Sequence, residues 1–324
     1  MATETDNPRC ERPTFGDELR AFWVAMPDKG AFGVLCVLWL ALFHLYGNST
    51  LGYVNTPSLF GWMDYAYSNR TDDEHGYYLP LLVLYLLWWK KDELQALPKR
   101  VWWPGVAFVL LALLIHLVGF QVQQTRLSIV AFYFGLYALG GVIWGGRWLL
   151  ATFFPFFLFA FGVPLGNKGD AVTQPLRQLA TDITAVIAQG PLGIPVIQNG
   201  TTIFDPSGRF SYEIAAACSG LRSLTAITVV AIVFAFLRFT SWWRRAVMIG
   251  AAVPLAIGSN VFRLTSIIIS AEAFGQQAGN FVHDNAVFSV LPYLPAFVGL
   301  FLLGWTLDGR LWAWIRRLKG AANE

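Results

Sequence analysis

Long apolar runs separated by short polar connections dominate the chain. Eight runs have about the length needed to cross a hydrocarbon core of roughly 30 Å, although the second is short and the seventh long. They lie near residues 30–47, 77–89, 104–120, 127–145, 148–164, 219–238, 245–271 and 286–307. The pattern predicts an all-α polytopic membrane protein with about eight transmembrane helices.

One polar segment, residues 165–218, is too long to be a simple connection. Within it, residues 170–189 carry apolar side chains at helical spacing, which predicts an amphipathic helix lying at the membrane surface: Val172, Leu176, Leu179, Ile183, Val186 and Ile187. Gly190 and Pro191 then interrupt the helix. Residues 194–204 have a hairpin pattern with Asn199-Gly200 at the turn, and residues 209–214 form a second extended piece. We therefore expect a small extracytoplasmic cap over residues 165–218.

Composition indicates a membrane protein, and the distribution of charge predicts its orientation in the membrane. It has 324 residues, 56% hydrophobic and 13% charged, whereas soluble domains average about 45–50% and about 25%. Basic residues gather in alternate connections: Arg9, Arg12, Arg20 and Lys29; Lys90, Lys91, Lys99 and Arg100; Arg147; Arg238, Arg244 and Arg245; Arg310, Arg316, Arg317 and Lys319. This bias predicts a multi-pass protein of the cytoplasmic (inner) membrane with both termini in the cytoplasm. The expected parts are a cytoplasmic tail (1–29), a transmembrane domain (30–307) and a second tail (308–324).

Three polar residues of chemical interest are expected at the outer face. Cys218 precedes the sixth apolar run, at a helix amino end, where unsatisfied N–H groups favour a thiolate and could receive an oxyanion. Arg263 interrupts the seventh run, with Asn260 one turn earlier, and a charge at such depth usually faces a bundle interior or a wet cavity. His283 follows in the outer loop, where the eighth run begins. Together a thiol, a guanidinium and an imidazole indicate a cysteine protease or transpeptidase.

Each of these residues also has a structural explanation. An isolated buried cysteine can be an inert apolar residue, Arg263 can be bonded to backbone carbonyls, and a loop histidine can be a cap. The other two cysteines, Cys10 and Cys36, lie in a charged tail and an apolar run. Four scattered histidines lack ligand spacing, so we expect no metal and no cofactor.

The motifs resemble those of the exosortase/archaeosortase family. The resemblance rests on Ala217-Cys218-Ser219-Gly220-Leu221-Arg222-Ser223, on Asn260-x-x-Arg263 and on His283, and it extends to the early outer-loop element from Glu74 to Pro80. It covers roughly residues 30–305. After His283 come Asp284, Asn285 and Ala286, where the family pattern would place a glycine.

The resemblance implies a function and a set of residue roles. Family members are inferred to cleave exported proteins at a carboxy-terminal sorting tail (a short motif, a helix, then basic residues), of the PEP-CTERM type in bacteria, and to pass them to an acceptor. Cys218, Arg263 and His283 would be catalytic. Substrate-binding or supporting roles would fall to Asn260, Arg222, Ser219, Gly220, His75 and Glu74. Arg222 could equally reach the interface or pair structurally, and His75 and Glu74 could be satisfied loop residues.

Other functions remain open from the residues alone. An intramembrane cysteine protease would hydrolyse its substrate and never transfer it. A transporter or lipid flippase would place Arg263 on a substrate path and would tolerate loss of Cys218. A membrane scaffold would need neither residue. Nothing in the chain indicates a nucleic-acid partner, and the acceptor (a polysaccharide, a lipid or another nucleophile) is not indicated either.

Overall fold

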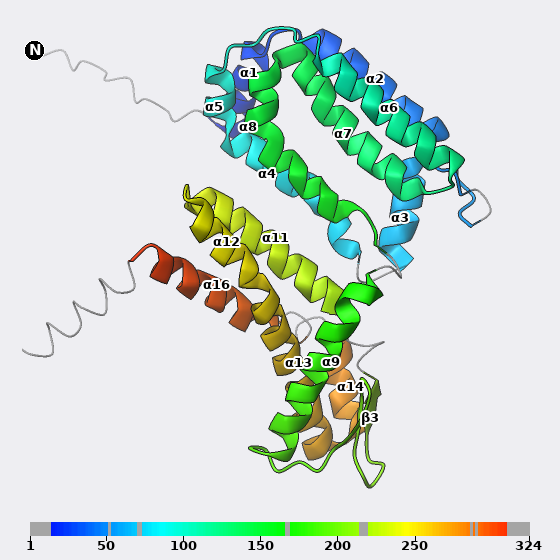
Figure 1. The fold of residues 1–324 in the computed structure, drawn as a ribbon, viewed down its shortest axis with the longest axis vertical. Helices are drawn as coiled ribbons and strands as arrows, with labels where there is room; N and C mark the ends of the chain where they lie inside the picture. Colours follow the sequence, from blue (N-terminus) through cyan, green and yellow to red (C-terminus); the bar gives the residue numbers. More distant parts are fainter. Residues whose placement is uncertain are drawn as a thin grey trace, which may run out of the picture. The chain divides into compact units, whose positions relative to one another are not determined.

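The chain folds into helices that group into two compact units. The computed structural model describes residues 14–50, 53–69, 73–165, 169–213, 220–285, 288 and 291–309. Unit 1 comprises Met1–Asn69 and Gly76–Pro164, and unit 2 comprises Arg70–His75 and Leu165–Glu324 (Figure 1). The predicted division into tails, membrane domain and cap stays a prediction.

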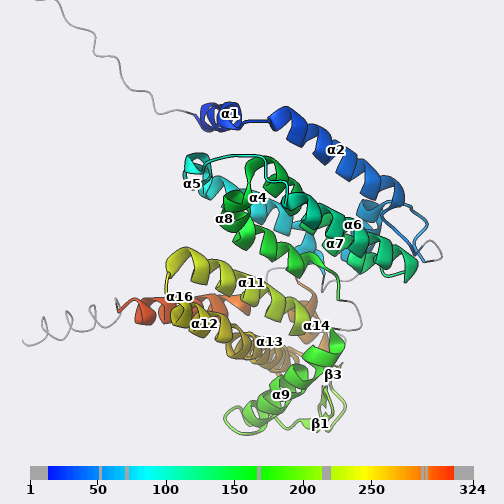
Figure 2. The same ribbon diagram turned by 45° about the horizontal axis from the view of Figure 1, so that its top comes forward.

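Unit 1 is built from helices. In chain order they are α1 (Phe15–Ala25), α2 (Lys29–Tyr46), α3 (Leu59–Asn69), the 3₁₀ turn η1 (Glu74–Tyr77) at the boundary between the units, α4 (Leu79–Trp89), α5 (Lys91–Ala96), α6 (Gly105–Gln121), α7 (Thr125–Trp144), α8 (Gly146–Phe157) and the 3₁₀ turn η2 (Leu158–Gly162). Helix α7 packs against both α6 and α2 (Figures 1 and 2).

The packing of α2 on α7 shows why small residues occur inside these apolar helices. The indole Nε1 of Trp39 donates to the backbone oxygen of Phe132 at 3.0 Å. The ring lies so close to Gly135 that a Cβ there would be 1.9 Å from it. Close helix contact in an apolar protein therefore depends on a missing side chain, as is typical of membrane helices.

Unit 2 contains the remaining helices and a small sheet. Its elements are α9 (Asp170–Gln189), β1 (Ile197–Asn199), β2 (Thr202–Phe204), β3 (Ser211–Glu213), α11 (Gly220–Arg238), α12 (Trp242–Gly250), α13 (Ala252–Phe274), α14 (Gln276–Asp284) and α16 (Tyr293–Leu307). The strands are antiparallel in the order β1-β2-β3. One core joins α9 and the strands to α13, and a second joins α11, α12, α13 and α16.

The hairpin forms where the sequence predicts it, with its turn shifted by one residue. Asn199 pairs with Thr202, so the two loop residues are Gly200 and Thr201. Gly200 has a φ of 59° and Thr201 does not share a positive φ, the pattern of a turn that requires glycine at its first central position. Asn199 is thus the last strand residue instead of a turn residue.

Helix α9 also forms as predicted, and the face that packs against protein is a different one from the apolar stripe. Val186 is 69% exposed, and Leu179 and Ile183 are also exposed. The buried face consists of small and polar residues: Thr173, Arg177, Ala180, Thr181, Thr184, Ala185 and Ala188. Small residues allow α9 to approach α13 closely, which leaves the larger apolar side chains on the outside.

Apolar helices account for every run that the hydropathy pattern predicts. Within the described residues, three helical stretches are long and apolar enough to cross a membrane: Lys29–Tyr46, Thr125–Trp144 and Trp242–Phe274. Shorter apolar helices occupy Leu79–Trp89, Gly105–Gln121, Gly146–Gly162, Leu224–Arg238 and Tyr293–Leu307. The chain is a helical membrane protein, whereas the number of eight spans and the orientation stay predictions.

Candidate functional site in unit 2

The reversal between α13 and α14 brings Arg263 and His283 together. Helix α13 ends at Gly275, whose φ of 87° is a conformation that favours glycine. Helix α14 then packs back against α13, and its Val282 contacts the core that α13 shares with α9. This corrects the expectation for His283. It lies in the last turn of α14 instead of a loop, and the final apolar helix begins only at Tyr293.

Arg263 holds one partner and keeps one donor unused. Its Nη2 donates to the backbone oxygen of His283 over 3.4 Å. Its Nε is buried and makes no hydrogen bond with any residue that the structure describes. A guanidinium is charged at every physiological pH, and a buried charged donor without an acceptor is costly. The buried Nε of Arg263 could therefore donate a hydrogen bond to a negatively charged oxygen of a substrate.

Neighbouring residues of α13 fix the helix around Arg263. Asn260 is buried one turn before Arg263, but no hydrogen bond joins the two side chains within the described residues. The hydroxyl of Ser259 donates to the backbone oxygen of Pro292 at 2.5 Å, directly before α16. Helix α13 is thus anchored to the start of the last helix next to the candidate site.

The remaining predicted site residues fall into three groups. Cys218 and Ser219 lie outside the described residues, while Gly220 and Arg222 lie in the first turn of α11. Helix α11 begins two residues after Cys218 and packs against α13 and α9. Glu74 and His75, like Asp73 before them, belong to unit 2, the unit that also holds Arg263 and His283, although the chain up to Asn69 and from Gly76 belongs to unit 1.

A charged cluster attaches the strands to α13. The Nη2 of Arg209 lies 2.8 Å from Oε2 of Glu272 on α13, and its Nε lies 3.1 Å from Oδ2 of Asp205. Asp205 is buried and also accepts from the hydroxyl of Ser207. The hydrogen bonds from Arg209, and then the one from Ser207, hold the pKa of Asp205 well below its ordinary value. Asp205, and after it Glu272, raises the pKa of Arg209.

Tyr212 of β3 extends this attachment to α14. Its hydroxyl donates to the backbone oxygen of Gln276 at 3.0 Å, in the first turn of α14. A Cβ on Gly279 would lie 2.0 Å from the same hydroxyl. The strand that precedes Cys218 in sequence is therefore packed directly on the helix that carries His283.

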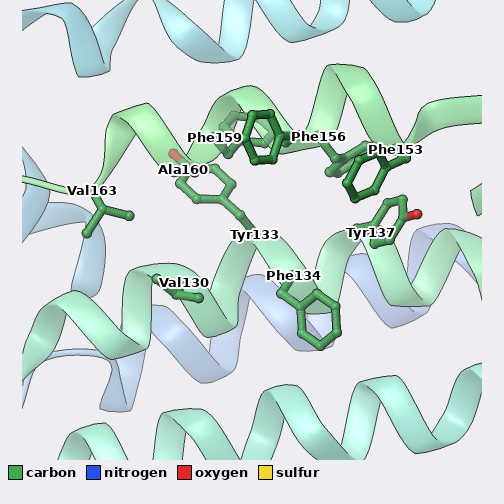
Figure 3. A pocket seen from close by; sticks show the side chains of 10 residues that line it. Val130, Tyr133, Phe134, Tyr137, Phe153, Phe156, Phe159, Ala160 and Val163 are labelled. Carbon is green, nitrogen blue, oxygen red and sulfur yellow. The ribbon is translucent and has the colours of Figure 1, made fainter. Parts of the chain in front are cut away.

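The cavities of unit 1 are of a different kind. One of about 450 Å³ lies between α7 and the α8–η2 segment and is lined by aromatic rings, with Tyr133 stacked on Phe159 at a centroid distance of 3.9 Å (Figure 3). A second, of about 640 Å³, lies under α1 beside Trp88 and Trp144. Neither lining contains a Cys, Ser, His, Asp, Glu or Lys side chain. Among the described residues no cluster of His, Cys, Asp and Glu has the make-up of a metal site.

Besides Asp205, two further buried charges in unit 2 were not singled out from the sequence. Arg177 is 5% exposed and Asp73 is 3% exposed. The signal for Arg177 was its helical phase with Thr173, Thr181 and Thr184, which defines the small polar face of α9. The signal for Asp73 was its place directly before Glu74 in the early outer-loop element.

Comparison with known families agrees with the motifs. Residues 62–302, well over half of the chain, match the family model described as Transmembrane exosortase (Exosortase_EpsH). Neither the curated proteins nor the solved structures contain a match to the chain. The match includes Glu74, His75, Cys218, Asn260, Arg263 and His283. The chain belongs to the transmembrane exosortase family.

Proposed function

We propose that this protein is a cysteine transpeptidase of the cytoplasmic membrane that cleaves exported proteins at a carboxy-terminal sorting tail of the PEP-CTERM type and transfers them to an acceptor. Family membership supports a membrane transpeptidase or protease role in general. The finer proposal rests on one observation in particular. Arg263 and His283, twenty residues apart, meet through the α13–α14 reversal, and the Nε of Arg263 donates to no acceptor among the described residues.

The proposed first step forms a thioester. The Cys218 thiolate attacks the scissile carbonyl carbon, and a carbon–sulfur bond forms while the carbonyl oxygen becomes an oxyanion. Arg263 donates to that oxyanion, where charge develops. His283, protonated by the thiol, then gives its proton to the leaving amine nitrogen as the carbon–nitrogen bond breaks.

The second step resolves the thioester. An acceptor nucleophile attacks the same carbonyl carbon, His283 takes its proton, and Cys218 leaves as thiolate. Arg263 again stabilises the oxyanion. Ser219, and Gly220 at the start of α11, would supply backbone N–H groups to this oxyanion. Arg222, Asn260, Glu74 and His75 would contact the substrate or support the catalytic residues, at the extracytoplasmic face of the membrane.

The decisive experiment is co-expression with a tail-bearing substrate. Wild-type protein is expected to convert the substrate to a shortened form, and Cys218→Ala is expected to abolish conversion. Cys36→Ala is the matched control, because Cys36 lies within α2 of unit 1. Unchanged processing by Cys218→Ala would exclude the catalytic proposal and favour a transporter, flippase or scaffold.

Transfer and hydrolysis are separated by the product. Mass spectrometry of the shortened substrate is expected to show an acceptor attached to its new carboxyl end. A free carboxylate alone would identify a protease that only hydrolyses.

A further inference from the structure

Arg177 is a buried cation that the proposed chemistry does not use. It lies in the second turn of α9, on the face that packs on α13 and α11. Figures 1 and 2 both show the amino-terminal half of α9 beside the first turns of α11. Arginine is almost never so fully buried unless it is paired, and a buried charge in a membrane protein is costly. We therefore expect a negatively charged group beside Arg177.

Most carboxylates of unit 2 already have another partner, which leaves few candidates for the anion beside Arg177. Of those whose side chains the structure describes, Asp205 and Glu272 bind Arg209, Asp308 binds Arg238, and Asp182 accepts from two glutamines at the surface. The remaining carboxylate that is buried to the same degree as Arg177 is Asp73.

The position of Asp73 in the chain supports the same pairing. Residues 73–75 group with unit 2, whereas residues 53–69 before them and residues 76–164 after them belong to unit 1. A segment this short needs a specific contact with unit 2 to be held there, because the chain on both sides of it belongs to unit 1. A buried ion pair with α9 supplies an attachment of this kind, because both charges lose their hydration together.

We propose that Asp73 and Arg177 form a buried ion pair that docks the Asp73–His75 segment onto α9. Both are positioning residues: they hold Glu74 and His75 in the unit that carries Arg263 and His283. The effect on catalysis rests on the proposed function, but the pairing itself does not.

The pairing is tested by thermal unfolding in detergent. Asp73→Asn and Arg177→Gln should each lower the unfolding midpoint by several degrees, because each leaves a charge buried alone. The double variant should fall no further than the worse single variant. Arg177→Gln combined with Asp205→Asn is the control and should be additive. Additive losses for Asp73 and Arg177 would overturn the proposal.

The positioning role is tested by processing of the tail-bearing substrate. Each single variant should lose about tenfold or more in rate, and the charge-reversed pair, Asp73→Arg with Arg177→Asp, should recover part of that loss. A reversed pair as inactive as the singles, in a protein that unfolds at the wild-type midpoint, would overturn the role. Processing that survives Cys218→Ala would instead exclude the proposed function and leave the thermal result standing.

Discussion

Arg263 has two roles that a lysine could not combine: it holds the backbone of His283, and it is proposed to donate to an oxyanion. One nitrogen of its guanidinium holds the backbone oxygen of His283, and another is buried with no acceptor within the described residues. The planar group offers several donors in fixed directions, whereas a lysine offers a single point charge. The residue thus connects the position of His283 to the place where we propose that an oxyanion forms.

Replacement of Arg263 therefore tests the direction of its donors as well as its charge. We expect Arg263→Gln to reduce the processing rate about 10²–10³-fold, the usual effect of losing one oxyanion donor. Arg263→Lys should recover little, because an ammonium cannot hold the His283 carbonyl and reach the substrate together. The measurement is single-turnover processing, with Arg238→Gln as the control arginine. Full activity in Arg263→Lys would contradict the assigned geometry.

Gly279 offers a test that alters the site without touching a charged group. A methyl group at this position would overlap the hydroxyl of Tyr212 and contact Ala271. We expect Gly279→Ala to push α14 away from β3, displace His283 and lower the processing rate about tenfold or more, since small misplacements are costly in catalysis. Gly258→Ala is the matched control, because nothing lies within 4 Å of the Cβ position there. Equal activity of the two variants would show that α14 does not position His283.

At the scale of elements, the strand region is bonded to both helices of the candidate site, α13 and α14. Arg209 binds α13 through Glu272, and Tyr212 binds α14 through Gln276. The contact of Arg209 with α13 depends on an ionised Asp205, whose pKa is lowered from an ordinary value of 3.8. A group with a lowered pKa in the folded state stabilises that state above its ordinary pKa.

Acid should therefore loosen the hairpin. Its stability should be constant above the ordinary pKa of Asp205 and should fall as the pH decreases below about 3.8 toward the lowered value. Hydrogen exchange of residues 197–213 at several pH values measures this loss. Asp205→Asn should be less protected at neutral pH and should show a flatter profile. A wild-type hairpin equally protected across this range would contradict the account.

Several elements could be predicted from the sequence because apolar length is a strong signal. Every predicted apolar run contains a helix, and the hairpin and α9 were also predicted. Helix α1 was missed although Thr14 and Asp17 form a capping box in front of it, since its surroundings are charged. Helix α14 was missed because it has only nine residues, and most of them are polar or small, so it shows no apolar run.

The residues of the candidate site were proposed from the sequence and stay predictions, whereas the contact between Arg263 and His283 was not foreseen. Chemistry-bearing residue types and the motif around Cys218 indicated Cys218, Arg263 and His283. The reversal at Gly275 was not foreseen, because one glycine in an apolar region has many possible roles. The apolar stripe of α9 was predicted, but the face that packs on protein was not, since periodicity identifies an apolar stripe and cannot tell whether protein or lipid covers it.

At the scale of the whole molecule, the chain separates aromatic cavities from polar chemistry. Unit 1 holds the apolar cavities, and unit 2 holds Arg263 and His283, the two proposed catalytic residues that the structure describes. The short segment 73–75 is assigned to unit 2 although it lies between parts of unit 1 in sequence. Motifs far apart in the chain are thereby collected in a single unit.

The predicted orientation can be tested by cysteine labelling in a variant that lacks the three native cysteines. With both termini in the cytoplasm, Thr201→Cys at the hairpin turn should react with a membrane-impermeant maleimide in spheroplasts. Lys99→Cys, in a basic connection, should react only after permeabilisation. The opposite labelling pattern would invert the topology and place the proposed site on the cytoplasmic side.

The reversal at Gly275 makes the site depend on helical phase. Arg263 and His283 lie on antiparallel helices, so their meeting fixes the number of residues on each side of the glycine. One residue inserted in α14 before His283 would turn the histidine by about 100° and shift it by about 1.5 Å, whereas four would return it nearly to its original direction one turn further on. Length variation between Gly275 and His283 is therefore expected in whole helical turns.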